Sequence, residues 1–130
     1  MAERYLIDTS AVIKYLNETF TPEGIAFIDG VVDKESLISF ISEIELQVWS
    51  PKNPDDLVTY KQFISSSFVF GISDQIIQET IRIRKEHNVK LPDALIAATA
   101  LLNNLTLIAD NDKDFLKITA LRYINPHSIA

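Results

Sequence analysis

Four acidic side chains lie close to points where a short apolar stretch of the sequence ends or a helical stretch begins. They are Asp8, Glu45, Asp93 and Asp114. Carboxylates that pack closely repel one another and raise each other's pKa, and a divalent cation with oxygen ligands relieves that repulsion. Mg²⁺ or Mn²⁺ fits better than zinc, because the chain has no cysteine and only two histidines. If the fold brings the acids together, they predict a metal-dependent site.

Alternating strands and helices must position these acids. Short apolar runs predict strands at residues 5–7, 36–40, 67–72, 105–109 and 121–124. Capping residues and apolar periodicity predict helices at residues 11–16, from 21 onward, 42–49, 53–65, from 73 or 74 to about 88, and 94–102. We therefore expect an α/β fold, a three-layer sandwich with a mainly parallel five-stranded sheet flanked by helices. Ligands of such sheets bind at the carboxyl ends of the strands, where the acids fall.

Each acid also has a purely structural interpretation. Asp8 is a favourable N-cap residue for the first helix, and Asp93 is a favourable acidic residue at the N-terminus of the apolar helix 94–102. Glu45 is an acid near a helix N-terminus, which the helix dipole favours. Glu43 and Glu45 are two positions apart and cannot share one helical face, and we interpret Glu45 as the inward one.

Length and composition narrow the protein class. The chain of 130 residues suits one domain over 1–130, with an ordinary globular balance of 47% hydrophobic and 23% charged residues. A net charge of −6 argues mildly against broad nonspecific nucleic-acid binding, but not against an acidic site that holds cations. The sequence has no apolar run long enough for a membrane span and no signal-peptide layout, so we expect a cytoplasmic protein.

Basic and aromatic residues add two weaker signals. The densest basic stretch comprises Arg82, Arg84, Lys85, His87 and Lys90. These basic side chains are suited to binding RNA phosphates, although a run of charged residues more often forms the solvent-exposed face of a helix. Three aromatic residues, Trp49, Tyr60 and Phe63, suit base stacking or a protein interface, but packing in the core or an interface is the more common role.

Four segments of the sequence together resemble the PIN-domain family, in particular its VapC-type toxins. They are residues 5–13, 41–46, 91–100 and 107–115, and the closing residues 123–126 fit the family's last strand. The resemblance spans nearly the whole chain. Its most specific part is the third segment, Leu-Pro-Asp-Ala-Leu-Ile-Ala-Ala-Thr-Ala.

The resemblance implies a PIN-like fold and a metal-dependent endoribonuclease, usually the toxin of a type II toxin–antitoxin pair. It further implies a homodimer, a cognate antitoxin whose tail occupies the acidic groove, and a structured RNA substrate of the tRNA or rRNA class. As a hypothesis, Asp8 and Asp93 bind Mg²⁺ directly, while Glu45 polarises the attacking water. Ser10 is expected to steady Asp8 through a hydrogen bond, or simply to cap the helix.

The fourth segment departs from the family pattern. Ala109 stands where the family commonly has a threonine, so one supporting hydrogen bond is lost. Asn111, Asp112 and Asp114 then compete for the last site position. We favour Asp114 as the fourth acid, with Asp112 as its rival and Asn111 as a residue that positions water or a ligand.

Other function classes fit less well. A phosphotransferase of the haloacid type would need a second aspartate two residues after Asp8, where Ser10 stands. A receiver domain would need its phosphoacceptor after the third strand, where the chain has Gly71 and Ile72. The main alternative is a noncatalytic PIN-like module that binds RNA or protein.

Overall fold

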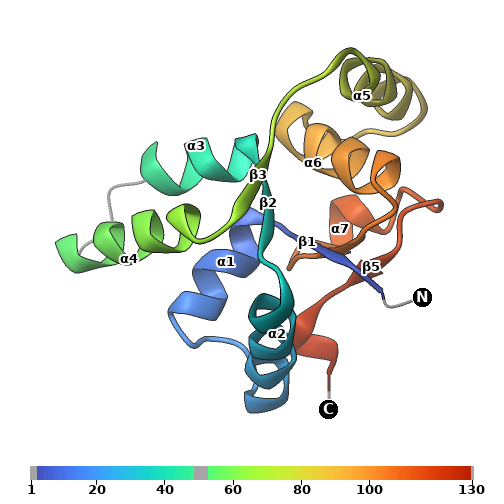
Figure 1. Cartoon of the computed structure of the whole chain (residues 1–130). Coiled ribbons are helices and arrows are strands. Elements are labelled where there is room, and N and C mark those ends of the chain that lie inside the picture. Colours follow the sequence, from blue (N-terminus) through green and yellow to red (C-terminus); the bar gives the residue numbers. More distant parts are fainter. Residues whose placement is uncertain (1–2, 49–52, 130) are drawn as a thin grey trace.

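The strands are short, and every ladder between them is parallel. The computed structural model describes residues 3–48 and 53–129. The strands are β1 (Tyr5–Ile7), β2 (Leu37–Ser39), β3 (Phe68–Phe70), β4 (Thr106–Ile108) and β5 (Tyr123–Ile124). They pair in the orders β1-β4-β5 and β2-β3. Because β1 also lies against β2, all five strands form the middle layer of the molecule (Figure 1).

Helices follow every strand except β5, which ends in a short 3₁₀ turn, η1 (Pro126–Ser128). The helices are α1 (Thr9–Leu16), α2 (Pro22–Lys34), α3 (Phe40–Val48), α4 (Pro54–Ser65), α5 (Asp74–Glu86), α6 (Leu91–Leu102) and α7 (Asp112–Phe115). This order confirms the predicted α/β class. The predicted helical role of Trp49 lies outside the described residues.

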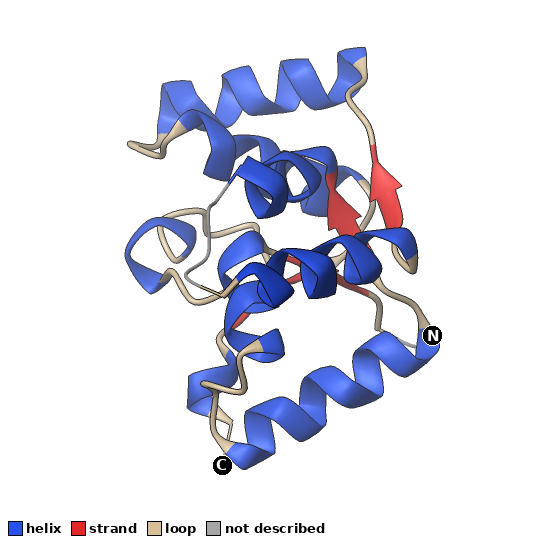
Figure 2. Ribbon diagram, turned by 90° about the vertical axis from the view of Figure 1, so that its left-hand side faces the viewer, coloured by secondary structure: helices blue, strands red, loops and turns tan. Residues whose placement is uncertain are grey.

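The two faces of the strands bury two separate cores, which confirms the three-layer arrangement (Figure 2). Leu6 and Leu107 belong to the core beneath α5, α6 and α7, whereas their neighbours Ile7 and Ile108 belong to the core beneath α1 to α4. Successive side chains of a strand point to opposite faces, so continuous apolar runs are what a strand covered on both sides requires.

Local capping accounts for several helix starts. The side chains of Thr21, Asn53 and Ser73 accept hydrogen bonds from backbone amides in the first turns of α2, α4 and α5, as their sequence positions predict. The acidic stretch at Asp110–Phe115 is more ordered than the predicted loop. Asn111 caps it, and residues 112–115 form the single turn α7.

Burial separates the apolar side chains of α5 and confirms core packing, the more common of the predicted roles, for Tyr60. On α5, Ile76 and Ile83 are buried, whereas Ile77 and Ile81 are 39% and 42% exposed. Tyr60 is fully buried in the core beneath α3 and α4, so it is not available for base stacking.

The C-terminal segment is fixed by a close approach to α2. A Cβ atom at Gly24 would lie 2.7 Å from the carbonyl oxygen of Pro126, closer than real Cβ atoms come to a backbone oxygen. Glycine at this position therefore lets η1 sit directly on the helix. The contact places the end of β5 next to the carboxyl edge of the strands.

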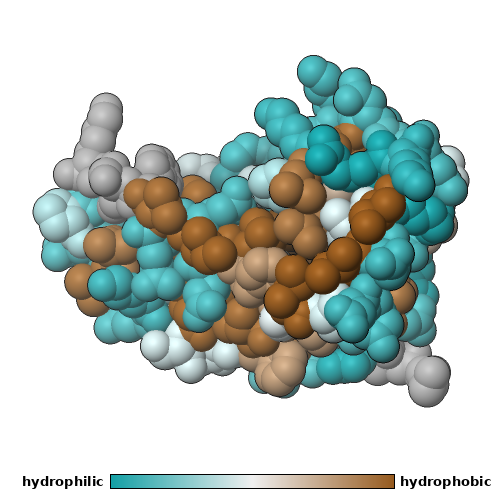
Figure 3. Space-filling view, turned by 90° about the horizontal axis from the view of Figure 1, so that it is seen from above, coloured by the Kyte–Doolittle hydropathy of each residue, from teal (hydrophilic) through white to brown (hydrophobic). Residues whose placement is uncertain are grey.

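Exposed apolar side chains gather on one side of the molecule. The larger ones on α3, α4 and around α5 are Ile44, Val48, Val58, Ile72, Ile77 and Ile81. Viewed from above, hydrophobic surface extends between the α3–α4 side and the α5–α6 side (Figure 3). Over the described ranges, no helix combines the length and the apolar character that crossing a membrane would require.

Candidate metal-binding and nuclease site

The predicted acids meet at the carboxyl ends of β1, β2 and β4. Asp8 follows β1 directly, and Glu45 lies on the helix that follows β2. Asp114 lies on α7, just past β4, and Asp93 lies in the first turn of α6. Electrostatic effects on Asp93 come from all three of the other acids, so the fold brings the four together.

Asp8 caps α1, as one of its two interpretations from the sequence predicts. Its side chain is only 5% exposed and caps α1 by accepting a hydrogen bond from the Ser10 amide (3.2 Å). The Ser10 hydroxyl donates a second bond to the same oxygen, Oδ2, at 2.6 Å, which confirms that Ser10 holds Asp8. Burial raises the pKa of Asp8, the Ser10 bonds oppose this rise, and the charge of Glu45 adds to it.

Glu45 turns toward Asp8 but remains open to solvent. The Thr9 hydroxyl donates to Glu45 Oε1 at 2.6 Å and lies 2.9 Å from the hydroxyl oxygen of Ser42, which is fully buried. Glu43 is half-buried whereas Glu45 is exposed, so burial does not bear out the prediction that Glu45 is the inward acid of the pair; the Thr9 bond nevertheless ties Glu45 to the start of α1. Thr9 and Ser42 were not predicted, although Ser42 and Glu45 are three residues apart and so share one helix face.

Asn111 connects the last two acids. Its Nδ2 group donates to Asp93 Oδ2 (3.3 Å) and to Asp114 Oδ2 (3.2 Å), and its Oδ1 accepts from the Asp114 amide (3.4 Å). Asp93 is not the N-cap of α6, because Lys90 occupies that position without a side-chain capping bond. The side chain of Asp93 is therefore free of capping and faces the other acids.

The charge state of Asp93 reflects this crowding. Burial, then the negative charges of Asp8 and Asp114, a hydrogen bond with Asp114 and the charge of Glu45, raise the pKa of Asp93 to about 6. The pKa of Asp114 is lowered instead, mainly by the hydrogen bond from Asn111. Paired carboxylates with opposite shifts are typical of groups that share a proton in the absence of a cation.

Asp112 points away from this group of acids. Its Oδ1 accepts hydrogen bonds from the Tyr123 hydroxyl (2.6 Å) and from Asn125 Nδ2 (3.0 Å), and these bonds lower its pKa. Asp110 likewise has partners of its own: it pairs with Lys14 of α1 and accepts a hydrogen bond from Asn125. The geometry thus favours Asp114 over Asp112 as the fourth acid.

Comparison with known proteins assigns the family. A family model described as PIN domain matches residues 5–121. The chain belongs to the PIN domain family. This confirms the resemblance predicted from the sequence. A search of curated protein sequences found no match.

Solved structures share the same PIN fold over almost the entire chain. A chain of DNA-bound VapBC from Salmonella typhimurium is 24% identical with a TM-score of 0.79, covering 96% of this chain and 99% of that chain. A chain of a toxin–antitoxin complex from Klebsiella pneumoniae is 28% identical with a TM-score of 0.70 and the same coverage. A chain of FitAcB from Neisseria gonorrhoeae, 19% identical, has a TM-score of 0.75 and again covers 96% and 99%.

The acids of this PIN domain do not form a ready-made chelate. Across residues 3–48 and 53–129, no three side chains of the His, Asp and Glu types are grouped closely enough to enclose a metal ion. The donor set nevertheless fits a hard cation, because it offers carboxylate oxygens, one of them on a half-buried group with a raised pKa.

The basic stretch of the PIN domain is partly neutralised. Arg82 pairs with Glu79 and Glu86 along α5, and Arg84 donates to the carbonyl oxygen of Val89. Arg84, Lys85 and Lys90 are exposed. The basic residues of α5 therefore form a solvent-exposed helix face. Lys90 is the basic residue nearest in sequence to Asp93.

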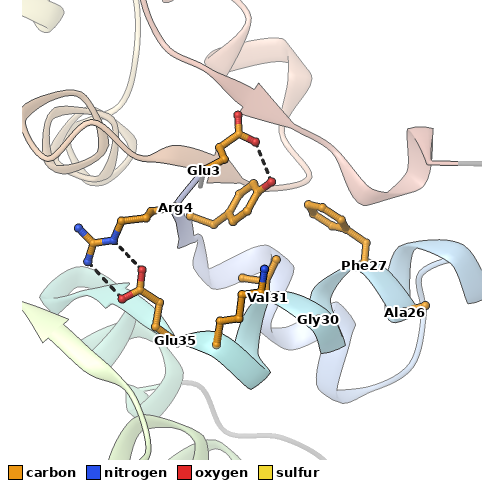
Figure 4. A pocket seen from close by; sticks show the side chains of 9 residues that line it. Glu3, Arg4, Ala26, Phe27, Gly30, Val31 and Glu35 are labelled. Carbon is orange, nitrogen blue, oxygen red and sulfur yellow. Dashed lines mark hydrogen bonds and ion pairs between the residues drawn. The ribbon is translucent and has the colours of Figure 1, made fainter. Parts of the chain in front are cut away.

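A cavity of about 630 Å³ in the PIN domain lies away from the acids. Tyr5, Phe27 and Val31 are among the residues that line it, at the amino end of β1 and along α2. Figure 4 shows the Arg4–Glu35 ion pair and the Glu3–Tyr5 hydrogen bond at its rim. It lies at the opposite end of β1 from Asp8 and contains none of the four acids.

Proposed function

We propose that this PIN domain is a Mg²⁺-dependent endoribonuclease and the toxin of a type II toxin–antitoxin pair, with Mn²⁺ as an alternative cation. The observation that carries the proposal is the position of Asp8, Glu45, Asp93 and Asp114 at one edge of the strands, where Asn111 hydrogen-bonds both Asp93 and Asp114. Membership in the PIN family supports it. The whole domain, residues 1–130, would act as one unit in the cytoplasm.

Asp8 and Asp93 would hold the cation, with Asp114 completing the ligand set and Asp112 excluded by its own partners. When bound, the cation lowers the pKa of a water molecule and orients it toward the scissile phosphate. The chain's side chains do the remaining work. Ser10 holds one carboxylate oxygen of Asp8 by a hydrogen bond. Asn111 hydrogen-bonds both Asp93 and Asp114 and so fixes the distance between them.

Glu45 is placed to take the proton of the attacking water. Thr9 binds Oε1 of Glu45 and so leaves the other carboxylate oxygen available, and the side chain is open to solvent and therefore to RNA. A carboxylate that is accessible and held by one hydrogen bond is suited to general-base catalysis.

The proposal includes two protein partners. The solved VapBC structures are complexes of toxin–antitoxin type, and the exposed apolar side chains between α3–α4 and α5 offer surface for a cognate antitoxin or a second copy of the chain. Contiguous apolar surface of this kind is typical of protein interfaces. We propose an antitoxin and a homodimer as the partners, with structured RNA of the tRNA or rRNA class as the substrate.

The direct test is RNA cleavage by the purified protein with Mg²⁺ and with EDTA, with the new ends mapped by sequencing. We expect cleavage at a small number of positions that requires the cation. Mn²⁺ binding without any RNA cleavage would instead favour the noncatalytic binding module, and the absence of both would reject the proposed site.

A comparison of two neighbouring aspartates tests the ligand set. Asp114→Asn should lower Mg²⁺-dependent cleavage by about 100-fold or more, since it removes a proposed ligand. Asp112→Asn should lower cleavage by less than about tenfold, because the amide oxygen can still accept from Tyr123. Initial rates at saturating Mg²⁺ measure both, and the reverse order of effects would assign the fourth position to Asp112.

A further inference from the structure

The hydroxyl of Tyr123 contacts three parts of the turn that carries Asn111. It accepts a hydrogen bond from the Asn111 amide (3.0 Å), lies 3.1 Å from the carbonyl oxygen of Ala109, and donates to Asp112 Oδ1 at 2.6 Å. One oxygen atom on β5 thus ties together the backbone between β4 and α7. Ser10 and Lys14 of α1 also hold the start of this turn, through the Asp110 amide and carboxylate, whereas the side chain of Ala109 can form no hydrogen bond.

Asn125 holds the same turn from two residues further along. Its Nδ2 group donates to Asp110 Oδ1 (2.9 Å) and to Asp112 Oδ1 (3.0 Å), while its Oδ1 accepts from the His127 amide. Side chains two residues apart on an extended segment point to the same side, so Tyr123 and Asn125 form one support. The Gly24–Pro126 contact fixes that support against α2.

The support acts on the acids through Asn111. The backbone amide of Asn111 binds Tyr123, and its side chain binds both Asp93 and Asp114. A displacement of this turn would therefore change the spacing of two proposed ligands. The ring of Tyr123 is also fixed, at 5.8 Å between ring centroids from the buried Phe115.

We propose that Tyr123, assisted by Asn125, is a positioning residue that sets the distance between Asp93 and Asp114 by holding the Asn111 turn. This inference rests on the proposed metal site. Tyr123 touches neither the proposed ligands nor a substrate, so its effect must pass through Asn111. Burial and the Asp112 carboxylate raise the pKa of Tyr123, which keeps its hydroxyl protonated and able to donate.

The test compares Tyr123→Phe with Tyr5→Phe. Both variants remove one hydroxyl that donates to a carboxylate, but Tyr5 binds Glu3 at the amino end of β1, away from the acids. Calorimetric titration with Mn²⁺ should show about 10- to 100-fold weaker binding for Tyr123→Phe, the usual cost of losing a group that orients ligands, and no change for Tyr5→Phe.

Amide hydrogen exchange gives a second readout that needs neither metal nor substrate. In Tyr123→Phe the Asn111 amide should exchange about five- to tenfold faster, as expected for one lost hydrogen bond. The amide of Leu107 in β4, which binds the carbonyl oxygen of Arg122, should be unaffected. A general loss of stability would accelerate both amides together, and that result would reject a positioning role.

The outcomes separate the two proposals. If the wild-type protein does not bind Mn²⁺, the proposed function fails, and the positioning role fails with it. If the wild type binds Mn²⁺ and Tyr123→Phe binds it equally well, only the positioning role is rejected. Should Tyr123→Phe not fold by circular dichroism, Asn125→Ala replaces it. This variant should weaken Mn²⁺ binding in the same direction, and unchanged binding would again reject the role.

Discussion

Asp8→Asn is expected to abolish Mg²⁺-dependent RNA cleavage, with a loss of at least about a thousandfold. The substitution removes the charge of the most buried of the four acids and exchanges one carboxylate oxygen for an amide nitrogen that cannot bind a cation. Initial cleavage rates with and without Mg²⁺ measure the effect. Wild-type rates in this variant would show that Asp8 serves only as a helix cap.

The same variant should not lose stability. Asparagine is as good an N-cap as aspartate, so α1 keeps its bond from the Ser10 amide. The pKa of Asp8 is raised in the folded protein, which means that its charge opposes folding at neutral pH when no cation is bound. We therefore expect an unchanged or higher Tm in EDTA. Asp33→Asn, at an exposed position late in α2, is the matched control and should leave both cleavage and Tm close to wild type.

Metal binding should depend on pH through Asp93. Its pKa of about 6 implies that a proton competes with the cation below this pH, so Mn²⁺ affinity should rise as pH increases from 5 to 7 and then level off. Titrations at several pH values measure this. In Asp93→Asn the binding should be weak throughout and nearly independent of pH over the same window, and a steep dependence in that variant would assign the titration to another group.

Stability without metal should change in the opposite direction. The folded-state pKa of Asp93 lies above its ordinary value of 3.8, so the folded protein binds the proton more tightly than the unfolded chain. The contribution of Asp93 to stability in EDTA, measured as the difference between the wild type and Asp93→Asn, should therefore fall as pH rises from about 4 to about 6. Added Mg²⁺ should reverse this trend, by about 2.7 kcal/mol at a concentration 100 times its Kd. A Tm gain from Mg²⁺ that does not grow with pH would contradict the assignment.

Local sequence signals predicted most of the fold for clear physical reasons. Strands covered on both faces need continuous apolar residues, so runs such as Tyr5-Leu6-Ile7 and Leu105–Ala109 mark them. Caps such as Thr21 and Asn53 act within one turn of the chain and can be found in the sequence. The helix α7 was missed because four residues are too few to show a helical period.

The acids of the candidate site could be predicted, but the side chains that support them could not. Asp8 and Asp93 stand out because each interrupts apolar sequence at the edge of a strand or helix. The contacts of Thr9 with Glu45 and of Tyr123 with Asn111 join segments that only the tertiary fold brings together. A single sequence does not encode such pairings in any local pattern. The sequence already favoured Asp114 over Asp112, and the bonds of Asp112 to Tyr123 and Asn125 support that preference.

Because Pro126 packs directly against Gly24, the geometry of the proposed site also depends on α2, a helix that carries none of the four acids. Any larger residue at position 24 would push the chain terminus outward, and Asn125 and Tyr123 would move with it. Substitutions tolerated in α2 should thus be limited by the proposed metal site at the carboxyl ends of the strands. During evolution, a substitution in such a surface helix can impair the site of the protein while the helix itself stays folded.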